Sequence, residues 1–144
     1  MKLGNYTELF YHFVWATRDR YPYISETVEP HLFRFIRWKC GELGVMVHAL
    51  NGTADHIHIA CSLPTKLSIA DFVEKVKGTS SRFVNSKAAE ENDLGACLYW
   101  QGGYGALTFS ASGLNRVAEY VHNQKAHHRD GGLKEKFETI TIDD

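Results

Sequence analysis

Two histidines, His56 and His58, lie two residues apart in a segment of small, apolar and β-branched residues. Such a segment is typical of a buried β-strand, on which successive side chains point to opposite faces of the sheet. The two imidazoles therefore share one face, roughly 6.5–7 Å apart by the rise per residue. At that spacing they can converge on one divalent cation. The alternative is a pair of satisfied histidines on a sheet surface.

A second pair of chemically capable residues, Tyr120 and Gln124, lies four residues apart in a segment with apolar residues at helical spacing. That spacing places both side chains on one face of a helix. A tyrosine hydroxyl can act as a nucleophile toward phosphorus. An amide oxygen can coordinate a hard cation such as Mg²⁺ or Mn²⁺. Taken singly, Tyr120 is equally typical of an aromatic packed against a sheet, and Gln124 of a solvated helix face.

The elements that must position these residues follow from periodicity, caps and turn residues. Strands are predicted at 6–17, 45–50, 55–63 and within 97–110, and helices at 25–43, 68–85 and 113–127. Ser25 or Thr27 is the predicted cap of the first helix and Ser68 that of the second; Asn51-Gly52 is a predicted hairpin turn, and 87–94 a polar connection. The order βαββαβα predicts an α+β fold, a ferredoxin-like or RRM-like four-stranded antiparallel sheet with helices.

Composition is consistent with one compact domain spanning residues 1–144, since the chain is 44% hydrophobic. No stretch approaches the roughly 18 apolar residues of a membrane span, and the N-terminus lacks a secretory pattern. The three cysteines, Cys40, Cys61 and Cys97, are scattered without a CxxC pair. We therefore expect buried thiols in a cytoplasmic protein, without a disulfide framework or a structural zinc site. The net charge of −1 does not indicate any class of partner.

Taken in order along the chain, these segments resemble the single-tyrosine HUH transposases, small IS200-like insertion-sequence enzymes that act on single-stranded DNA. The residues Asp55-His56-Ile57-His58 resemble the His-hydrophobe-His motif, and 120–124 resembles the tyrosine helix. Segments 11–20, 67–82 and 100–109 also resemble the family. The resemblance covers nearly the whole chain as a single HUH transposase domain.

The resemblance implies a metal-dependent DNA strand transferase. His56, His58 and Gln124 would bind a divalent cation, Mg²⁺ or Mn²⁺. Tyr120 would attack a backbone phosphate, form a 5′-phosphotyrosine bond and release a 3′-hydroxyl. The expected partners are single-stranded DNA with hairpin-bearing element ends and a second subunit in a homodimer. Whether Tyr120 serves its own site or that of its partner stays open.

Several further residues have two interpretations each. Asp55 either orients a ligand histidine or closes the hairpin turn. The basic residues either contact DNA phosphates or form solvated faces; they are Arg18, Arg20, Lys75, Lys77 and Arg82. Aromatic residues either stack on unpaired bases or pack internally; they are Tyr99, Trp100 and Tyr104. His122, His127 and His128 are expected near the site, but no role is assigned to them. The C-terminal residues 138–144 have no assigned role either.

Two other functions compete with transposition. A non-catalytic nucleic-acid-binding module has the same strand order as RNA-recognition domains. That alternative lacks the expected sheet aromatics and gives Tyr120 and Gln124 no purpose. A domesticated HUH nuclease that processes genomic repeat hairpins would share the whole site, and the sequence does not separate it from a mobile-element enzyme.

Overall fold

The computed structural model describes residues 4–90 and 97–141, and it contains the predicted four-stranded antiparallel sheet. Its strands are β1 (Phe10–Ala16), β2 (Met46–Gly52), β3 (His56–Ser62) and β4 (Gly105–Phe109). They lie in the order β2-β3-β1-β4, with antiparallel pairing throughout. This order is that of the ferredoxin-like fold, so the predicted fold class is confirmed.

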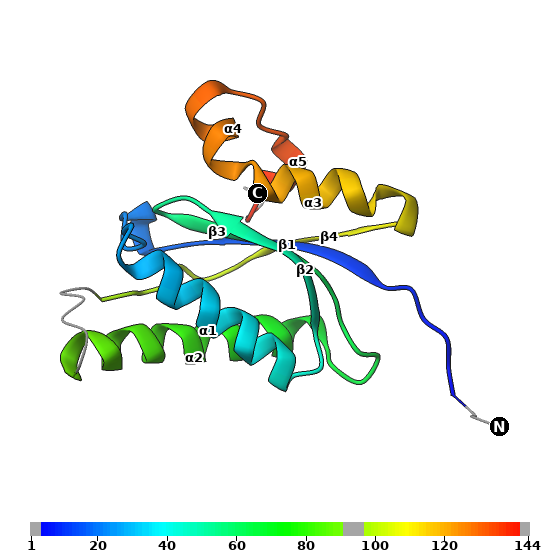
Figure 1. Cartoon of the computed structure of the whole chain (residues 1–144), viewed down its shortest axis with the longest axis horizontal. Helices are drawn as coiled ribbons and strands as arrows, with labels where there is room; N and C mark the ends of the chain where they lie inside the picture. The colour runs from blue at the N-terminus through cyan, green and yellow to red at the C-terminus, as the bar shows by residue number, and fades with distance from the viewer. Residues whose placement is uncertain (1–3, 91–96, 142–144) are drawn as a thin grey trace.

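Two long helices, α1 (Val28–Glu42) and α2 (Ile69–Glu90), cover one face of the sheet (Figure 1). Of the two predicted caps of α1, Ser25 makes the contact, since its Oγ accepts the Val28 N–H at 3.1 Å, whereas the Thr27 side chain makes no cap bond within the described residues. The predicted cap of α2 is confirmed, since Ser68 Oγ accepts the Asp71 N–H at 3.0 Å. Between the helices and the sheet lies the main core. Its fully buried members include Phe13, Trp15, Leu32, Ile36, Ile57, Ile59 and Phe72.

The opposite face of the sheet carries three shorter helices, α3 (Leu114–His122), α4 (Gln124–Asp130) and α5 (Glu135–Glu138) (Figure 1). The small side chains of Ala49 and Ala60 let α3 pack closely on the strands, where Val117 and Val121 are buried. Phe137 of α5 joins the same cluster. Short 3-10 turns, Arg18–Arg20 and Ala111–Gly113, follow β1 and β4. The imidazoles of β3 therefore emerge beneath α3, α4 and α5.

The predicted turn at Asn51-Gly52 is wrong, because both residues pair within β2, opposite His58 and Ile57. The hairpin instead turns at residues 53–55, closed by the Thr53 N–H donating to the His56 carbonyl at 3.0 Å. A Cβ on Gly52 would lie 2.2 Å from that carbonyl oxygen. The glycine therefore serves close strand approach and not a turn.

The helices also depart from their predicted limits. The segment 113–127 is broken at Asn123, whose φ of −95° and ψ of 18° separate α3 from α4. The side chain of Lys125 anchors α4 by donating to Asn51 Oδ1 at 2.8 Å and Glu29 Oε1 at 2.9 Å. Helix α2 extends through Glu90, into the predicted polar connection, and residues 91–96 of that connection lie outside the described residues.

Two smaller findings concern the termini of strands and the thiols. The first strand begins at Phe10 and not at residue 6.

Cys40 and Cys61 are buried free thiols as expected, whereas Cys97 is exposed, so the prediction of buried thiols is wrong for Cys97. Within residues 4–90 and 97–141, no helix is long and apolar enough to cross a membrane.

Candidate metal and nucleophile site

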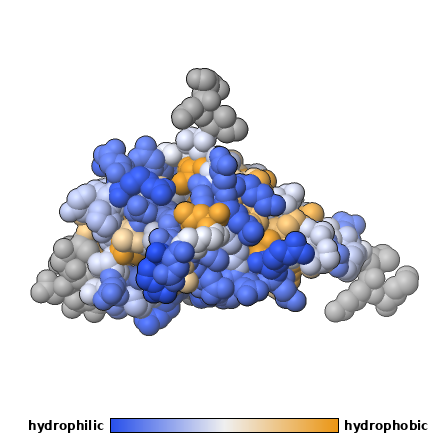
Figure 2. Space-filling view, turned by 90° about the horizontal axis from the view of Figure 1, so that it is seen from above, coloured by the Kyte–Doolittle hydropathy of each residue, from blue (hydrophilic) through white to orange (hydrophobic). Residues whose placement is uncertain are grey.

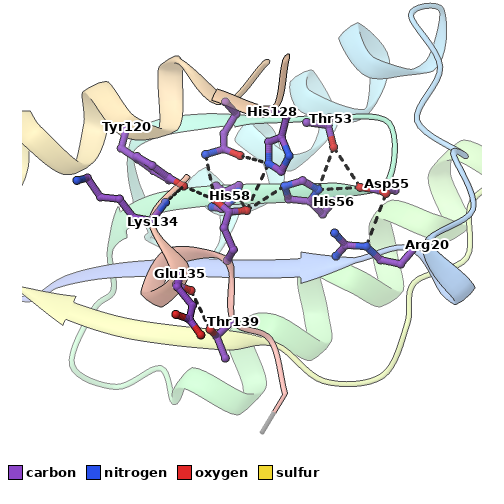
Figure 3. Close-up of polar contacts among 12 residues, drawn as sticks. Arg20, Thr53, Asp55, His56, His58, Tyr120, His128, Lys134, Glu135 and Thr139 are labelled. Atoms are coloured by element: carbon purple, nitrogen blue, oxygen red, sulfur yellow. Dashed lines mark hydrogen bonds and ion pairs between the residues drawn. The ribbon is translucent and has the colours of Figure 1, made fainter. Parts of the chain in front are cut away.

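His56 and His58 lie on the face of β3 that α3, α4 and α5 cover, and both are fully buried (Figure 3). Ile57 between them points into the main core on the other face. The two imidazole rings stand edge to face with centroids 5.1 Å apart. The alternation predicted from the sequence is therefore present, and both Nε2 atoms lie beside one carboxylate, that of Glu138.

The Nδ1 atom of each imidazole is held by a neighbouring side chain. For His56, the partners are Asp55 Oδ1 at 2.8 Å and Thr53 Oγ1 at 2.9 Å. For His58, the partner is His12 Nε2 at 2.8 Å. Partners on Nδ1 fix the ring orientation and leave Nε2 for a ligand. Asp55 is thus placed to orient a histidine, while its backbone carbonyl also receives the Thr17 N–H at 2.8 Å.

Tyr120, in the last turn of α3, is buried with its hydroxyl beside the histidines (Figure 3). The hydroxyl donates to Glu138 Oε2 and accepts the Lys134 N–H at 3.0 Å. Burial and the neighbouring Glu138 carboxylate raise the pKa of Tyr120 to about 12. In this arrangement the phenol keeps its proton at neutral pH, and its oxygen is tied to two groups of the C-terminal segment.

Gln124 opens α4 and is fully buried against the same group of residues. Its Oε1 lies 3.1 Å from His128 Nε2, and its Nε2 lies 3.5 Å from Glu138 Oε2. The break at Asn123 therefore does not separate Gln124 from Tyr120. The amide links the imidazole of His128 to the carboxylate of Glu138.

Glu138 is one of two site residues, with His12, that were not predicted from the sequence. Its Oε1 lies 3.1 Å from His58 Nε2, 3.3 Å from His56 Nε2 and 3.4 Å from His128 Nε2. Partial burial raises the pKa of the Glu138 carboxyl, but the neighbouring imidazoles of His56 and His58 outweigh burial and hold that pKa far below its usual range. Glu138 is a lone acid in a short terminal segment, so no motif or periodicity indicated it.

The donor set fits a divalent cation. Ligand atoms of His56, His58, His128 and Glu138 all lie within 4.8 Å of one another. Within residues 4–90 and 97–141, the buried Nε2 of His56 has no hydrogen-bond partner, although Glu138 Oε1 is 3.3 Å away. Ligands at about 2.1 Å from one cation are separated from each other by about 3.0–3.4 Å, and Glu138 Oε1 lies 3.1–3.4 Å from the three imidazoles.

His12 extends the site beneath His58 and gives the metal-free protein a pH dependence. Burial, with a smaller effect of His58, lowers the pKa of His12 from 6.5 to about 3. His12 therefore binds a proton near pH 6.5 in the unfolded chain, whereas in the folded chain it binds one only near pH 3. Between these values the unfolded state binds more protons, so the stability falls as the pH falls.

We expect the free energy of unfolding, measured by urea denaturation with a chelator present, to fall by about 1 kcal/mol per pH unit below about pH 6.5 because of this one group. The His12→Gln variant should have a shallower decrease, because glutamine retains a polar contact to His58 but does not titrate. The neighbouring histidines also titrate: burial lowers the pKa of His58, whereas the carboxylates of Glu138 and Asp55 outweigh burial and raise the pKa of His56. An equal slope in the wild type and the variant would show that His12 is not the group responsible.

An open cleft of about 720 Å³ borders the site beside the C-terminal segment. Arg20 lines it, and the same side chain lies 3.6 Å from Asp55 Oδ2. Ala16 of β1, Gln101 and Gly102 also line it. The face above α3 and α4 is largely hydrophilic with small hydrophobic patches near its middle (Figure 2). The cleft reaches the site at Glu138, which also lines it.

The other candidate residues fall into two groups. Lys77 donates to the carbonyls of Gln101 and Gly103, and Trp100 Nε1 donates to Ser80 Oγ, so these two have internal roles. Tyr104 packs near Phe13 in the core. Exposed residues are Arg18, Tyr99, Lys75, Arg82 and His122. Among them Arg18 lies over the Tyr99 ring at 4.6 Å, while His127 stacks on Tyr120 with centroids 4.7 Å apart.

Known proteins with similar sequences and folds are transposases. ISDra2 transposase TnpA from Deinococcus radiodurans is 28% identical over 123 residues, which are 84% of this chain and 87% of that protein. A crystal structure of a Deinococcus radiodurans protein described as a transposase superposes with a TM-score of 0.65 at 28% identity, covering 86% of this chain and 98% of that one.

A second solved structure supports the fold alone, because the identity is only 12%. It is a REP-associated tyrosine transposase bound to a REP hairpin, with a TM-score of 0.63 over 90% of this chain and 76% of that one. The family model described as "Transposase IS200 like" matches residues 5–124, from before β1 to the first residue of α4. The chain therefore belongs to the IS200-like transposase family.

Proposed function

We propose that this transposase cleaves and rejoins single-stranded DNA with Tyr120 as the nucleophile. A divalent cation, Mg²⁺ or Mn²⁺, would be held by His56, His58 and Gln124. The observation that carries the proposal is the single carboxylate of Glu138, which touches the histidine Nε2 atoms through one oxygen and the Tyr120 hydroxyl through the other. The Tyr120 hydroxyl and the histidines of the cation site are therefore separated by one carboxylate group, that of Glu138.

In the proposed reaction the Tyr120 oxygen attacks a backbone phosphorus and loses its proton. The new oxygen–phosphorus bond is a 5′-phosphotyrosine, and the bond to the 3′-oxygen breaks to leave a 3′-hydroxyl. Attack by a 3′-hydroxyl on the phosphotyrosine reverses the step and joins strands. When bound, the cation supplies positive charge beside the phosphoryl oxygens. The proposal needs no nucleotide cofactor, because the tyrosine link retains the bond energy.

The residues around the site would keep this arrangement rigid. Asp55 and Thr53 hold His56 through its Nδ1, and His12 holds His58 in the same way. Tyr120 lies against its own chain's His58, with ring centroids 6.1 Å apart. This contact favours a site completed within one subunit, while the homodimer stays a prediction from the family resemblance.

The proposed substrate is single-stranded DNA flanking a hairpin. The REP-associated neighbour is itself bound to a REP hairpin, which supports a hairpin substrate for this chain. A domesticated nuclease acting on repeat hairpins would use the same residues and the same chemistry. A purely binding module is disfavoured, because it gives no purpose to a buried Tyr120 beside two buried histidines.

The experiment is incubation of the protein with a hairpin-bearing single-stranded oligonucleotide labelled at either its 3′ or its 5′ end. With Mn²⁺ or Mg²⁺ present, we expect a covalent protein–DNA adduct on a denaturing gel. The adduct should carry the 3′ label and disappear with a chelator. An adduct carrying the 5′ label, or one formed equally well with chelator, would contradict the proposal.

A further inference from the structure

The carboxylate of Glu138 occupies a position that the reaction needs for DNA. Its Oε1 is within 3.1–3.4 Å of the Nε2 atoms of His56, His58 and His128. Its Oε2 accepts the Tyr120 hydroxyl and lies 3.5 Å from Gln124 Nε2. A phosphate undergoing attack must likewise lie between the cation site and the tyrosine, with phosphorus about 3–3.5 Å from the attacking oxygen.

Two anionic groups cannot occupy that position together. We propose that Glu138 is a resting-state ligand of the cation site and that the scissile phosphate replaces it when DNA binds. The inference rests on the proposed function, because it takes the cation site and the nucleophile from it. It adds that His128 and Glu138 complete the site in the absence of DNA, and that Glu138 must leave before cleavage.

The segment that carries Glu138 is attached in a way that permits such an exchange. It follows Gly131 and Gly132, whose φ values of 94° and 95° suit glycine and mark a turn away from α4. The segment also borders the cleft of about 720 Å³, through which a strand can reach it.

The same movement would also release the nucleophile. The Tyr120 hydroxyl donates to Glu138 and accepts from the backbone N–H of Lys134, and both groups belong to the C-terminal segment 134–141. While these bonds are made, the phenolic oxygen is directed toward the segment and not toward a substrate. Displacement of the segment therefore vacates the phosphate position and frees the nucleophile in one step.

The first test measures Mn²⁺ affinity without DNA by electron paramagnetic resonance. Glu138→Gln should weaken Mn²⁺ binding by about 10-fold or more, since loss of even an outer-shell partner has an effect of that size. The matched control is Glu135→Gln, an exposed carboxylate in the same helix. It removes the same charge and should leave the affinity unchanged. Equal affinities of wild type and Glu138→Gln would overturn the ligand role.

The second test measures binding of a fluorescent oligo(dT) strand with a chelator present. Glu138→Gln should bind at least about 5-fold more tightly than wild type, because a like charge beside a bound phosphate opposes binding. Glu135→Gln controls for the change in net charge. Affinity of the Glu138→Gln protein equal to or weaker than that of Glu135→Gln would show that Glu138 does not stand in the phosphate position.

The third test uses the unaltered protein and needs no cleavage. Hydrogen exchange of the backbone amides in 134–141 should become faster when oligo(dT) binds, because the Lys134 N–H loses its bond to Tyr120. Unchanged or slower exchange would overturn the displacement. None of the three measurements depends on Tyr120 being the nucleophile, so a failure of the proposed function and a failure of this inference are distinguishable.

Discussion

Replacement of Tyr120 by phenylalanine is expected to abolish the covalent protein–DNA adduct and to lower strand cleavage by at least about 10⁴-fold. The change removes the only atom that forms the proposed bond to phosphorus and keeps the ring that packs against Phe137 and His127. The folded protein should lose about 1–2 kcal/mol, since the hydroxyl makes two hydrogen bonds. Denaturing gels and a urea titration measure the two effects separately.

The matched control is Tyr99→Phe, because the Tyr99 ring is 40% exposed and lies outside the group of residues around Glu138. This variant should form the adduct at the rate of the wild type. Single-strand affinity should persist in the Tyr120→Phe protein, because phosphate contacts and the cleft do not require the phenol. An adduct that survives in Tyr120→Phe would show that another side chain is the nucleophile.

Replacement of His56 by alanine is expected to lower metal-dependent cleavage by about 10³-fold or more while oligonucleotide binding is retained. The reason is the buried Nε2 of His56, which lies beside the other donor atoms and has no hydrogen-bond partner among the residues that the structure describes. Mn²⁺ titrations should show weaker binding. A moderate loss of stability, about 1–3 kcal/mol, should accompany it, since Asp55 and Thr53 lose their shared partner.

The control for His56→Ala is His122→Ala, which removes an exposed imidazole at the end of α3. The backbone carbonyl of His122 accepts from the Asn51 amide, and the substitution leaves that hydrogen bond in place. Cleavage and Mn²⁺ affinity should be unchanged in this variant. If His56→Ala lost cleavage and DNA binding to the same extent, with a collapse in stability, the imidazole would have a structural role instead.

Much of the fold followed from local patterns. The alternation around Ile57 placed both histidines on one face, and Ser25 and Ser68 marked the starts of α1 and α2 correctly. The hairpin turn was predicted at Asn51-Gly52, which is the wrong place. A glycine that allows two strands to approach closely cannot be told by sequence from a glycine in a turn. The break at Asn123 is followed by contacts of Lys125 with Glu29 and Asn51, which lie far away in the sequence and leave no local pattern.

The site was predictable to the extent that its residues belong to periodic elements. His56, His58, Tyr120 and Gln124 are brought together as the pattern and the resemblance indicated. Two members were not predicted. His12 lies in a strand that is otherwise rich in apolar residues. As a buried polar residue it needs a hydrogen-bond partner, and this was a signal that the sequence offered. Glu138 reaches the site only through the tertiary placement of a four-residue helix, for which the sequence has no local signal.

In the proposed reaction Tyr120 becomes covalently linked to DNA beside the histidines of β3. Tandem mass spectrometry of peptides from the adduct formed with Mn²⁺ and a hairpin-bearing single strand identifies the linked residue. We expect a nucleotide attached through a 5′-phosphate to Tyr120. A nucleotide attached to any other residue, or a cleaved strand without a protein link, would contradict the proposed reaction.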